Sequence, residues 1–175
     1  RVLEGKTVLM TGAGRGMGRS MSIALAAAGA KVAMIDIDED VLQEAAKEAE
    51  DAGGQGSIKP LICDVTDADR AKETAEEIVS SFGSLDVLVN DAVVGPERIK
   101  DFFVRPAKFW DLDNNLWNAM LRVNIFGPQL MAKTCAPYMM DKGWGRIINV
   151  TTSLDTMYLS GAGAYGPTKA ALEAH

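Results

Sequence analysis

The stretch Thr11-Gly12-Ala13-Gly14-Arg15-Gly16-Met17-Gly18 decides the fold, because it joins an apolar run at residues 7–10 to a small, apolar segment at residues 16–29. A bound pyrophosphate needs a strand, a glycine turn and a helix N-terminus in this order. The glycines let the backbone approach the phosphates, while free N–H groups and the helix dipole supply positive potential. The stretch therefore predicts a dinucleotide site, and the alternative is a glycine turn without a ligand.

Apolar runs and helical patterns alternate along the chain. Further runs that suit buried parallel strands lie at residues 31–35, 58–63, 85–90 and 146–151. Helical patterns lie at residues 38–53, with Asp38 as the cap, and from Thr66 or Asp67 to about Phe82. A loop at residues 95–111 leads to a long helix at about residues 113–138. The alternation predicts an α/β fold, a Rossmann-like doubly wound parallel sheet in three α/β/α layers.

The composition narrows the range of functions. The 175 residues are 47% hydrophobic and 24% charged, which is typical of one soluble globular domain. The net charge of -6 argues against nucleic acid as a partner. The absence of a ~20-residue apolar run argues against a membrane partner, and the absence of an apolar signal region before the first strand predicts a cytoplasmic location. Cys63 and Cys135 lack the spacing of a metal site or a disulfide scaffold, so we expect two buried thiols and no bound metal.

The glycine spacing narrows the family. Gly12, Gly16 and Gly18 fit Thr-Gly-x-x-x-Gly-x-Gly and not the Gly-x-Gly-x-x-Gly fingerprint of the commoner Rossmann dehydrogenases. The turn also lacks the Gly-Lys-Ser/Thr ending of a P-loop. In this motif the sequence resembles the classical short-chain dehydrogenase/reductase family. A sugar-nucleotide epimerase of the extended branch is a rival, but its spacing would put Gly at position 15, where Arg15 stands.

Asp36 ends the second predicted strand, where an acidic residue meets the adenosine ribose in Rossmann folds. A carboxylate there accepts from the ribose 2′-hydroxyl and repels a 2′-phosphate, so NAD is favoured over NADP. In the resembled family a basic residue in the glycine turn often accompanies NADP, so Arg15 keeps NADP as an alternative. Asp36 could also be one more solvated acid beside Asp38, Glu39 and Asp40.

The resemblance implies two further parts of the cofactor site. Asp64 and Val65, after the third strand, border the adenine, and Asn90 matches the first Asn of the family's Asn-Asn-Ala-Gly. This sequence instead has Asn90-Asp91-Ala92-Val93, so Val93 adds bulk where backbone normally passes close to the cofactor. The candidate cofactor-binding residues are Gly12, Gly14, Arg15, Gly16, Met17, Gly18, Asp36, Ile37, Asp64, Val65, Asn90, Ala92, Tyr165 and Lys169.

Tyr165 and Lys169 are the candidate acid–base pair. They are four residues apart, hence on one helical face, and Pro167 suits the first turn of that helix. A free tyrosine ionises only near pH ~10, but Lys169 and the positive nicotinamide ring both favour the phenolate. Tyr165 would take the alcohol proton during oxidation and return it during reduction, while the nicotinamide carries the hydride.

A second pair with the same spacing, Tyr138 and Lys142, shows that this motif alone is weak. Tyr138 follows Pro137 near the end of a helix, and no strand end with hydroxyl side chains precedes it. We therefore interpret this second pair as structural.

The remaining catalytic candidates come from the resemblance. The family uses a Ser at the end of the fifth strand to polarise the substrate carbonyl. Thr152 takes that register and Ser153 follows it, so both stay candidates, with Ser153 slightly favoured. Asn124 matches the helix Asn that holds a water linking Lys169 to solvent, although a mid-helix Asn is more often exposed or bonded to its own backbone. His175 has no assigned role.

The resemblance as a whole implies an NAD(P)-dependent oxidoreductase that interconverts a secondary alcohol and a ketone. Its substrate would be a small-molecule alcohol or carbonyl, and it would form a dimer or tetramer through the long helix and the Tyr165 helix. The long helix offers an apolar side for this contact, formed by Leu116, Met120, Val123 and Met131. A catalytically impaired dinucleotide-binding or scaffolding protein is the alternative. Since the sequence ends soon after Tyr165, we expect one domain over residues 1–175 that lacks the C-terminal part of the fold.

Overall fold

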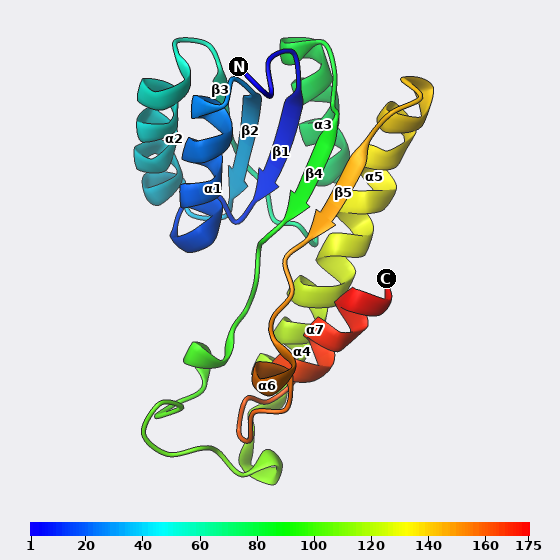
Figure 1. Cartoon of the computed structure of the whole chain (residues 1–175). Helices are drawn as coiled ribbons and strands as arrows, with labels where there is room; N and C mark the ends of the chain where they lie inside the picture. Colours follow the sequence, from blue (N-terminus) through cyan, green and yellow to red (C-terminus); the bar gives the residue numbers. More distant parts are fainter.

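In the computed structural model, which describes residues 1–175, five parallel strands form one sheet in the order β3-β2-β1-β4-β5 (Figure 1). The strands are β1 (Thr7–Thr11), β2 (Lys31–Asp36), β3 (Ile58–Ile62), β4 (Val87–Asn90) and β5 (Arg146–Asn149). The predicted Rossmann-like α/β sheet is confirmed. The strand order reverses between β1 and β4, and ligands of doubly wound sheets bind in the crevice at that point.

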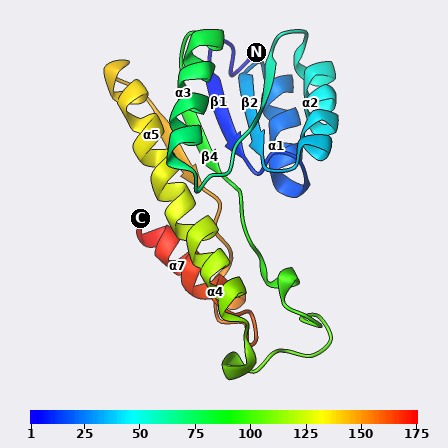
Figure 2. The same ribbon diagram turned by 180° about the vertical axis from the view of Figure 1, so that it is seen from behind.

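Helices cover both faces of the sheet and then continue beyond it (Figures 1 and 2). On one face lie α1 (Gly16–Ala27) and α2 (Glu39–Gly53), and on the other lie α3 (Ala68–Phe82) and α5 (Gly127–Asp141). Beyond the carboxyl ends of the strands lies a projection of three helices, α4 (Asn114–Leu121), α6 (Leu154–Met157) and α7 (Tyr165–Ala174). Residues 91–113 loop out between β4 and α4, with 3-10 turns at Pro96–Arg98 and Phe109–Asp111.

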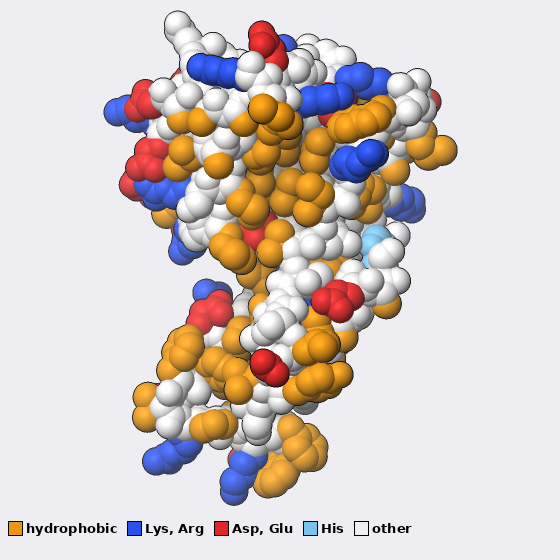
Figure 3. All heavy atoms as spheres, viewed as in Figure 1, with side chains coloured by type: hydrophobic (Ala, Val, Ile, Leu, Met, Phe, Trp, Pro, Cys, Tyr) orange, Lys and Arg blue, Asp and Glu red, His pale blue; other side chains and the backbone are white.

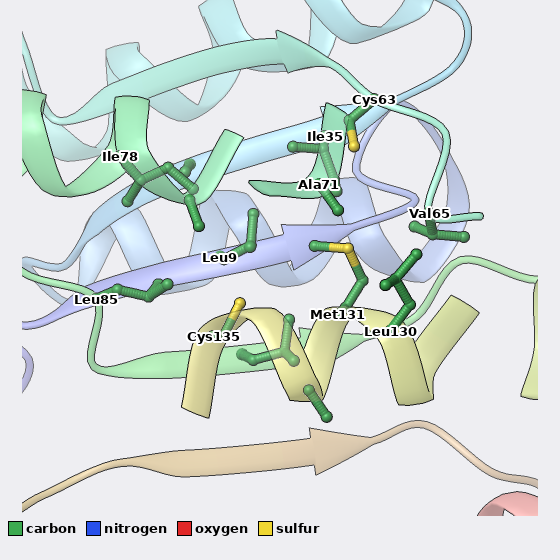
Figure 4. Packing of buried hydrophobic residues seen from close by; sticks show 14 of the residues in the cluster. Leu9, Ile35, Cys63, Val65, Ala71, Ile78, Leu85, Leu130, Met131 and Cys135 are labelled. Atoms are coloured by element: carbon green, nitrogen blue, oxygen red, sulfur yellow. The ribbon is translucent and has the colours of Figure 1, made fainter. Parts of the chain in front are cut away.

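Alternate residues of the central strands supply the two layers of the core. Val8 and Met10 of β1 belong to the cluster shared with α1 and α2, whereas Leu9 belongs to the cluster shared with α3 and α5 (Figure 4). This alternation is why the sheet needs helices on both faces. Cys63 and Cys135 are buried free thiols, as predicted, and both lie in the cluster shared with α3 and α5. Burial raises the pKa of Cys135 to about 12.

Two helix predictions were wrong in detail. The single long helix expected at residues 113–138 is α4, a π-helical turn at Arg122–Phe126 and then α5, which continues to Asp141. Asp38 occupies the cap position of α2, but its side chain makes no capping hydrogen bond, because it pairs with Arg15 instead.

The apolar side chains expected to face a second copy of the chain lie inside this one. Met120 and Met131 are buried, because α4 and α5 turn them towards the chain's own apolar clusters. Leu116 and Val123 pack against the same clusters, so the predicted contact surface is wrong. The apolar side chains that these helices expose are Trp117, Phe126 and Met140.

The edge strand β5 is covered less than the rest of the sheet. Ile147 and Ile148 are 42% and 49% exposed, and Figure 3 shows hydrophobic side chains at the surface of both the sheet and the projection. None of the helices is both long enough and apolar enough to cross a membrane.

Candidate functional site

The glycine turn is closed against the end of β4. Gly12 has a φ of +66°, and a Cβ there would lie 2.8 Å from the Cα of Ala92. A Cβ on Gly18 would overlap the carbonyl oxygen of Gly12. The hydroxyl of Thr11 accepts from the backbone N–H groups of Asp91 and Ala92, both at 3.0 Å. These contacts bring the predicted residues Gly12, Gly18 and Ala92 together at the point where the strand order reverses.

Asp36 lies beside this turn at the carboxyl end of β2. Its Oδ2 accepts from the backbone N–H of Gly14 at 3.0 Å, and its Oδ1 accepts from Ile37 at 2.8 Å and from Asp38 at 3.2 Å. The guanidinium of Arg15 forms an ion pair with Asp38. The Asp36 carboxylate is therefore held at the turn, and Arg15 of the turn is paired with Asp38. Of the remaining predicted residues here, Gly16 has a φ of +55°, and Met17 and Ile37 expose their side chains.

Asp64 and Val65 follow β3 at the same edge of the sheet. Asp64 uses its carboxylate locally, since its Oδ1 accepts from the backbone N–H of Thr66 at 2.8 Å. Val65 is buried, and a Cβ on Gly127 would lie 2.7 Å from one of its methyl groups. Val65 thus packs against the start of α5, while the exposed Asp64 remains accessible.

Asn90 and Asp91 place two unpaired acceptors under the turn. The amide of Asn90 donates to Asn149 Oδ1 at 2.9 Å, which ties the ends of β4 and β5 together. Asn90 Oδ1 and Asp91 Oδ1 are buried and have no hydrogen-bond partner. Val93, which stands where the family motif has Gly, is 44% exposed.

Lys169 lies buried one turn after Tyr165 in α7. Its side chain is 4% exposed, and its Nζ donates to the carbonyl of Val150 at 2.6 Å. The same Nζ lies 5.8 Å from the centre of the Tyr165 ring. Burial lowers the pKa of Lys169, and the negative charge of Asp91 opposes that shift. Burial likewise raises the pKa of Asp91, and Lys169 and the backbone of Gly18 oppose it.

Asn124 lies in the π-helical turn and is 1% exposed, which excludes the alternative of an exposed Asn. Its Oδ1 accepts from the N–H of Val94 at 2.8 Å, and its amide donates to the Val94 carbonyl at 3.0 Å and to Thr168 Oγ1 at 3.1 Å. Thr168 in turn donates to the carbonyl of Tyr165 at 2.7 Å. Asn124 therefore joins the chain after β4 to α7, and π-turns are frequent at functional sites.

The two candidate hydroxyls differ in their surroundings. Ser153 is exposed, caps α6 and lies 3.0 Å from the hydroxyl of Thr156. Thr152 is half-buried. Neither side chain is hydrogen-bonded to Tyr165 in this structure, so the geometry leaves both as candidates.

The second Tyr/Lys pair is structural, as predicted. Lys142 forms an ion pair with Asp86, which is fully buried and also accepts from the N–H of Thr7 at 2.8 Å and the hydroxyl of Ser84 at 2.9 Å. Tyr138 packs against the apolar cluster beneath α5. This pair thus fixes the opposite end of the sheet from Tyr165.

Sequence reasoning missed the partners that fix α7, namely Thr168 and the carbonyls of Val94 and Val150. These contacts join segments that are far apart in the chain, so no local sequence pattern predicts them. Only Thr168, as a hydroxyl side chain next to Lys169, could have been considered a candidate. No three His, Cys, Asp or Glu side chains are grouped so that they could hold a metal ion.

Comparison with known proteins gives a consistent picture. A family model described as short chain dehydrogenase matches residues 6–175. The 3-oxoacyl-(acyl-carrier-protein) reductase FabG of Thermotoga maritima is 34% identical over 168 residues, which are 96% of this chain and 64% of that protein. The D-threitol dehydrogenase of Mycolicibacterium smegmatis is 31% identical over 167 residues, which are 95% of this chain and 60% of that protein. The chain thus spans less than two thirds of the length of these relatives.

Solved structures superpose on nearly the whole chain. A metagenomic short-chain oxidoreductase in complex with NADP has a TM-score of 0.86 at 28% identity, over 99% of this chain and 74% of its own. An NAD+-bound xylitol dehydrogenase has a TM-score of 0.86 at 25% identity, over 99% of this chain and 63% of its own.

Proposed function

The chain belongs to the short chain dehydrogenase family, and from that premise we propose that the protein interconverts a secondary alcohol and a ketone by hydride transfer with a nicotinamide dinucleotide. The observation that carries the proposal is Lys169, a buried ammonium 5.8 Å from the Tyr165 ring. A buried charge is retained at a cost in stability, so this one favours a role beside the tyrosine. The names of the relatives, a reductase and a dehydrogenase, support the same chemistry.

The residues present fit a dinucleotide. At Gly12, Gly14 and Gly18 a Cβ would lie within 3 Å of neighbouring atoms, so these positions need glycine, which suits a backbone that approaches a pyrophosphate. Asp36 would accept from the ribose, and the buried unpaired oxygens of Asn90 and Asp91 show that polar groups under the turn still lack partners. When bound, the cofactor supplies or accepts the hydride. The structural neighbours were solved with NADP and with NAD+, which supports either form, and we propose NAD because of Asp36.

The chain's own residues would handle the proton. Tyr165 would remove the hydroxyl proton from the alcohol, or donate it to the ketone oxygen in the reverse direction. The positive charge of Lys169 favours the phenolate form of Tyr165 and would also hold the nicotinamide ribose. Thr152 or Ser153 would donate a hydrogen bond to the substrate oxygen. The substrate is a small alcohol or carbonyl compound, and the whole protein is a homo-oligomer in this proposal.

Replacing Tyr165 by Phe tests the mechanism. Tyr165→Phe keeps the ring and removes the acid, so kcat should fall by about 10²-fold or more, while the NAD dissociation constant changes little. Lys169→Ala should lower kcat and also weaken NAD binding. The measurements are steady-state kinetics on a panel of secondary alcohols and ketones, and isothermal titration with NAD, on the whole protein.

Tyr138→Phe is the matched control, because it makes the same change in the structural Tyr/Lys pair, and it should leave kcat unaltered. Near-normal turnover by Tyr165→Phe would show that the catalytic assignment is wrong. NAD binding without turnover of any compound would favour the alternative, a dinucleotide-binding protein that has lost catalysis.

A further inference from the structure

We propose that the β4–α4 connection, residues 91–113, holds Tyr165 in place for proton transfer through the side chain of Ile99, which is therefore a positioning residue. This inference rests on the proposed function, because it presumes that Tyr165 transfers the proton. The connection leaves the sheet at the carboxyl end of β4, extends along the projection and returns at α4 (Figures 1 and 2).

The connection is anchored by apolar packing around Ile99. Ile99 is 6% exposed and is the only buried side chain among residues 96–113. It forms a small cluster with Met120 of α4 and with Ala164, the residue before Tyr165, and Tyr165 packs against that cluster. Four partly buried side chains of the connection pack against the same cluster, namely Val94, Phe102, Ala107 and Leu112. The connection is thus held at the start of α7, with Ile99 as its most buried apolar contact.

Two glycines make the contact between the connection and this part of the chain very close. A Cβ on Gly161 would lie 2.8 Å from the Cβ of Pro106 and 3.0 Å from the N of Ala107. A Cβ on Gly163 would lie 3.3 Å from the Cδ1 of Ile99. There is therefore no room for an unstrained side chain between the connection and Gly161 of the backbone that leads into α7.

A polar contact fixes the other side of the same arrangement. Asn124 bonds both backbone groups of Val94, near the start of the connection, and also the hydroxyl of Thr168 in the first turn of α7. The connection is therefore tied to α7 before Tyr165 by packing and after it by hydrogen bonds. Two attachments on either side of one residue define where that residue lies.

Proton transfer is sensitive to such placement. The phenol oxygen must come within hydrogen-bond reach of the substrate oxygen, and a misplacement of ~1 Å can reduce a rate about 10²-fold. Ile99→Ala removes the anchor and leaves a space beside Ala164 and Tyr165. We expect kcat to fall about tenfold or more, while the NAD dissociation constant stays the same because Gly12 and Asp36 lie on other elements.

The matched control is Ile78→Ala. Ile78 is fully buried in the layer between α3 and the sheet (Figure 4), in a different cluster from the one that Tyr165 contacts, and it loses the same atoms. Both variants should unfold at lower urea concentration than the unmodified protein, and kcat is compared where both are folded. Only Ile99→Ala should lose activity, and Ile99→Val should recover most of it. In a Tyr165→Phe background, Ile99→Ala should leave the residual rate unchanged.

A pair of glycine variants gives a second, independent test. Gly161 and Gly143 both have positive φ, +81° and +71°, so replacement by Ala strains the backbone similarly at each. A Cβ on Gly143 meets nothing within 4 Å, whereas a Cβ on Gly161 would press on Pro106 and Ala107. Gly161→Ala should therefore lower kcat, and Gly143→Ala should not.

The outcomes separate this inference from the proposed function. If Ile99→Ala and Gly161→Ala lost no more kcat than their controls, or if Ile99→Ala slowed the Tyr165→Phe protein by the same factor as the unmodified one, the inference would be overturned and the proposed function would stand. Absence of Tyr165-dependent turnover in the unmodified protein would overturn the proposed function and this inference with it.

Discussion

Among single residues, Asp36 has the most direct bearing on the choice of cofactor. Its carboxylate is oriented by the backbone of Gly14 and Ile37, so it would face the ribose with little freedom to turn away. Arg15, the residue that could favour a 2′-phosphate, is paired with Asp38. A phosphate in this position would meet the carboxylate of Asp36, while Arg15 is engaged by Asp38.

We expect the protein to bind NAD more tightly than NADP, and Asp36→Ala to reduce that preference about tenfold or more, as loss of a hydrogen bond to a charged group implies. Isothermal titration with both cofactors measures the two dissociation constants. Asp40→Ala is the control, because it removes the same charge from an exposed position nearby. Equal dissociation constants in the unmodified protein would contradict the assignment of Asp36.

The residues that sequence could identify are those whose chemistry depends on local spacing. The glycines from Gly12 to Gly18 and the pair Tyr165 and Lys169 each lie within one turn or one helix face, so their spacing alone predicts that they lie together. Asn124 was a candidate, but its partners Val94 and Thr168 were not predicted, because hydrogen bonds between distant segments leave no local pattern. The choice between Thr152 and Ser153 depends on the path of a loop, which no periodicity fixes.

At the scale of elements, Asp86 and Lys142 join the start of β4 to the end of α5. Burial raises the pKa of Asp86, but hydrogen bonds from Lys142, Thr7 and Ser84 outweigh it and hold that pKa below its usual value. A carboxyl group whose pKa is lower in the folded state stabilises the fold above its unfolded pKa of ~3.9, and this contribution is lost as the pH falls through the folded pKa.

Asp86→Asn should lower the free energy of unfolding by about 1–3 kcal/mol at pH 7, near the lower end because Lys142 is partly exposed. The difference between the variant and the unmodified protein should shrink as the pH falls below ~4, because the carboxyl becomes protonated first in the unfolded state and, at still lower pH, in the folded state. Urea unfolding at several pH values measures this, and Asp141→Asn, an exposed acid at the end of the same helix, is the control. A difference that is independent of pH would contradict the assigned role.

The elements also show where a local pattern is insufficient. The sequence pattern predicted one continuous helix from about residue 113 to 138, because residues in a π-helical turn remain helical and leave no break in the pattern. The turn around Asn124 could therefore not be predicted. The turn is favoured by tertiary contacts, since the Asn124 side chain bonds both Val94 and Thr168. Asp38 was expected to cap α2 on its position alone, but a guanidinium from another element competes for the same carboxylate.

For the whole molecule, the three layers and the parallel sheet could be predicted because apolar runs and helical patterns alternate along most of the sequence. Which helix faces pack inwards did not follow, because α4 and α5 are apolar on more than one side. Met120 and Met131 lie in the chain's own core, and Trp117 and Phe126 are the side chains left outside.

We expect the whole protein to be a dimer or tetramer that uses the exposed face of α4 and the π-turn. Trp117→Ser combined with Phe126→Ser should shift the mass measured by light scattering to a smaller species, because it removes two exposed apolar side chains. Phe103→Ser, at a more exposed position in the β4–α4 connection, should not. A monomer at micromolar concentration in the unmodified protein would contradict the expectation.

The two buried cysteines allow local opening of the fold to be measured by alkylation. Alkylating reagents attack the thiolate, and burial raises the pKa of both Cys63 and Cys135, so neither reacts while α3 and α5 stay packed on the sheet. Each alkylation event must therefore wait for that layer to open, and the labelling rate reports how often it does. Because this layer lies away from Tyr165, the alkylation rate of the two cysteines distinguishes a variant that loosens α7 alone from one that loosens the whole fold.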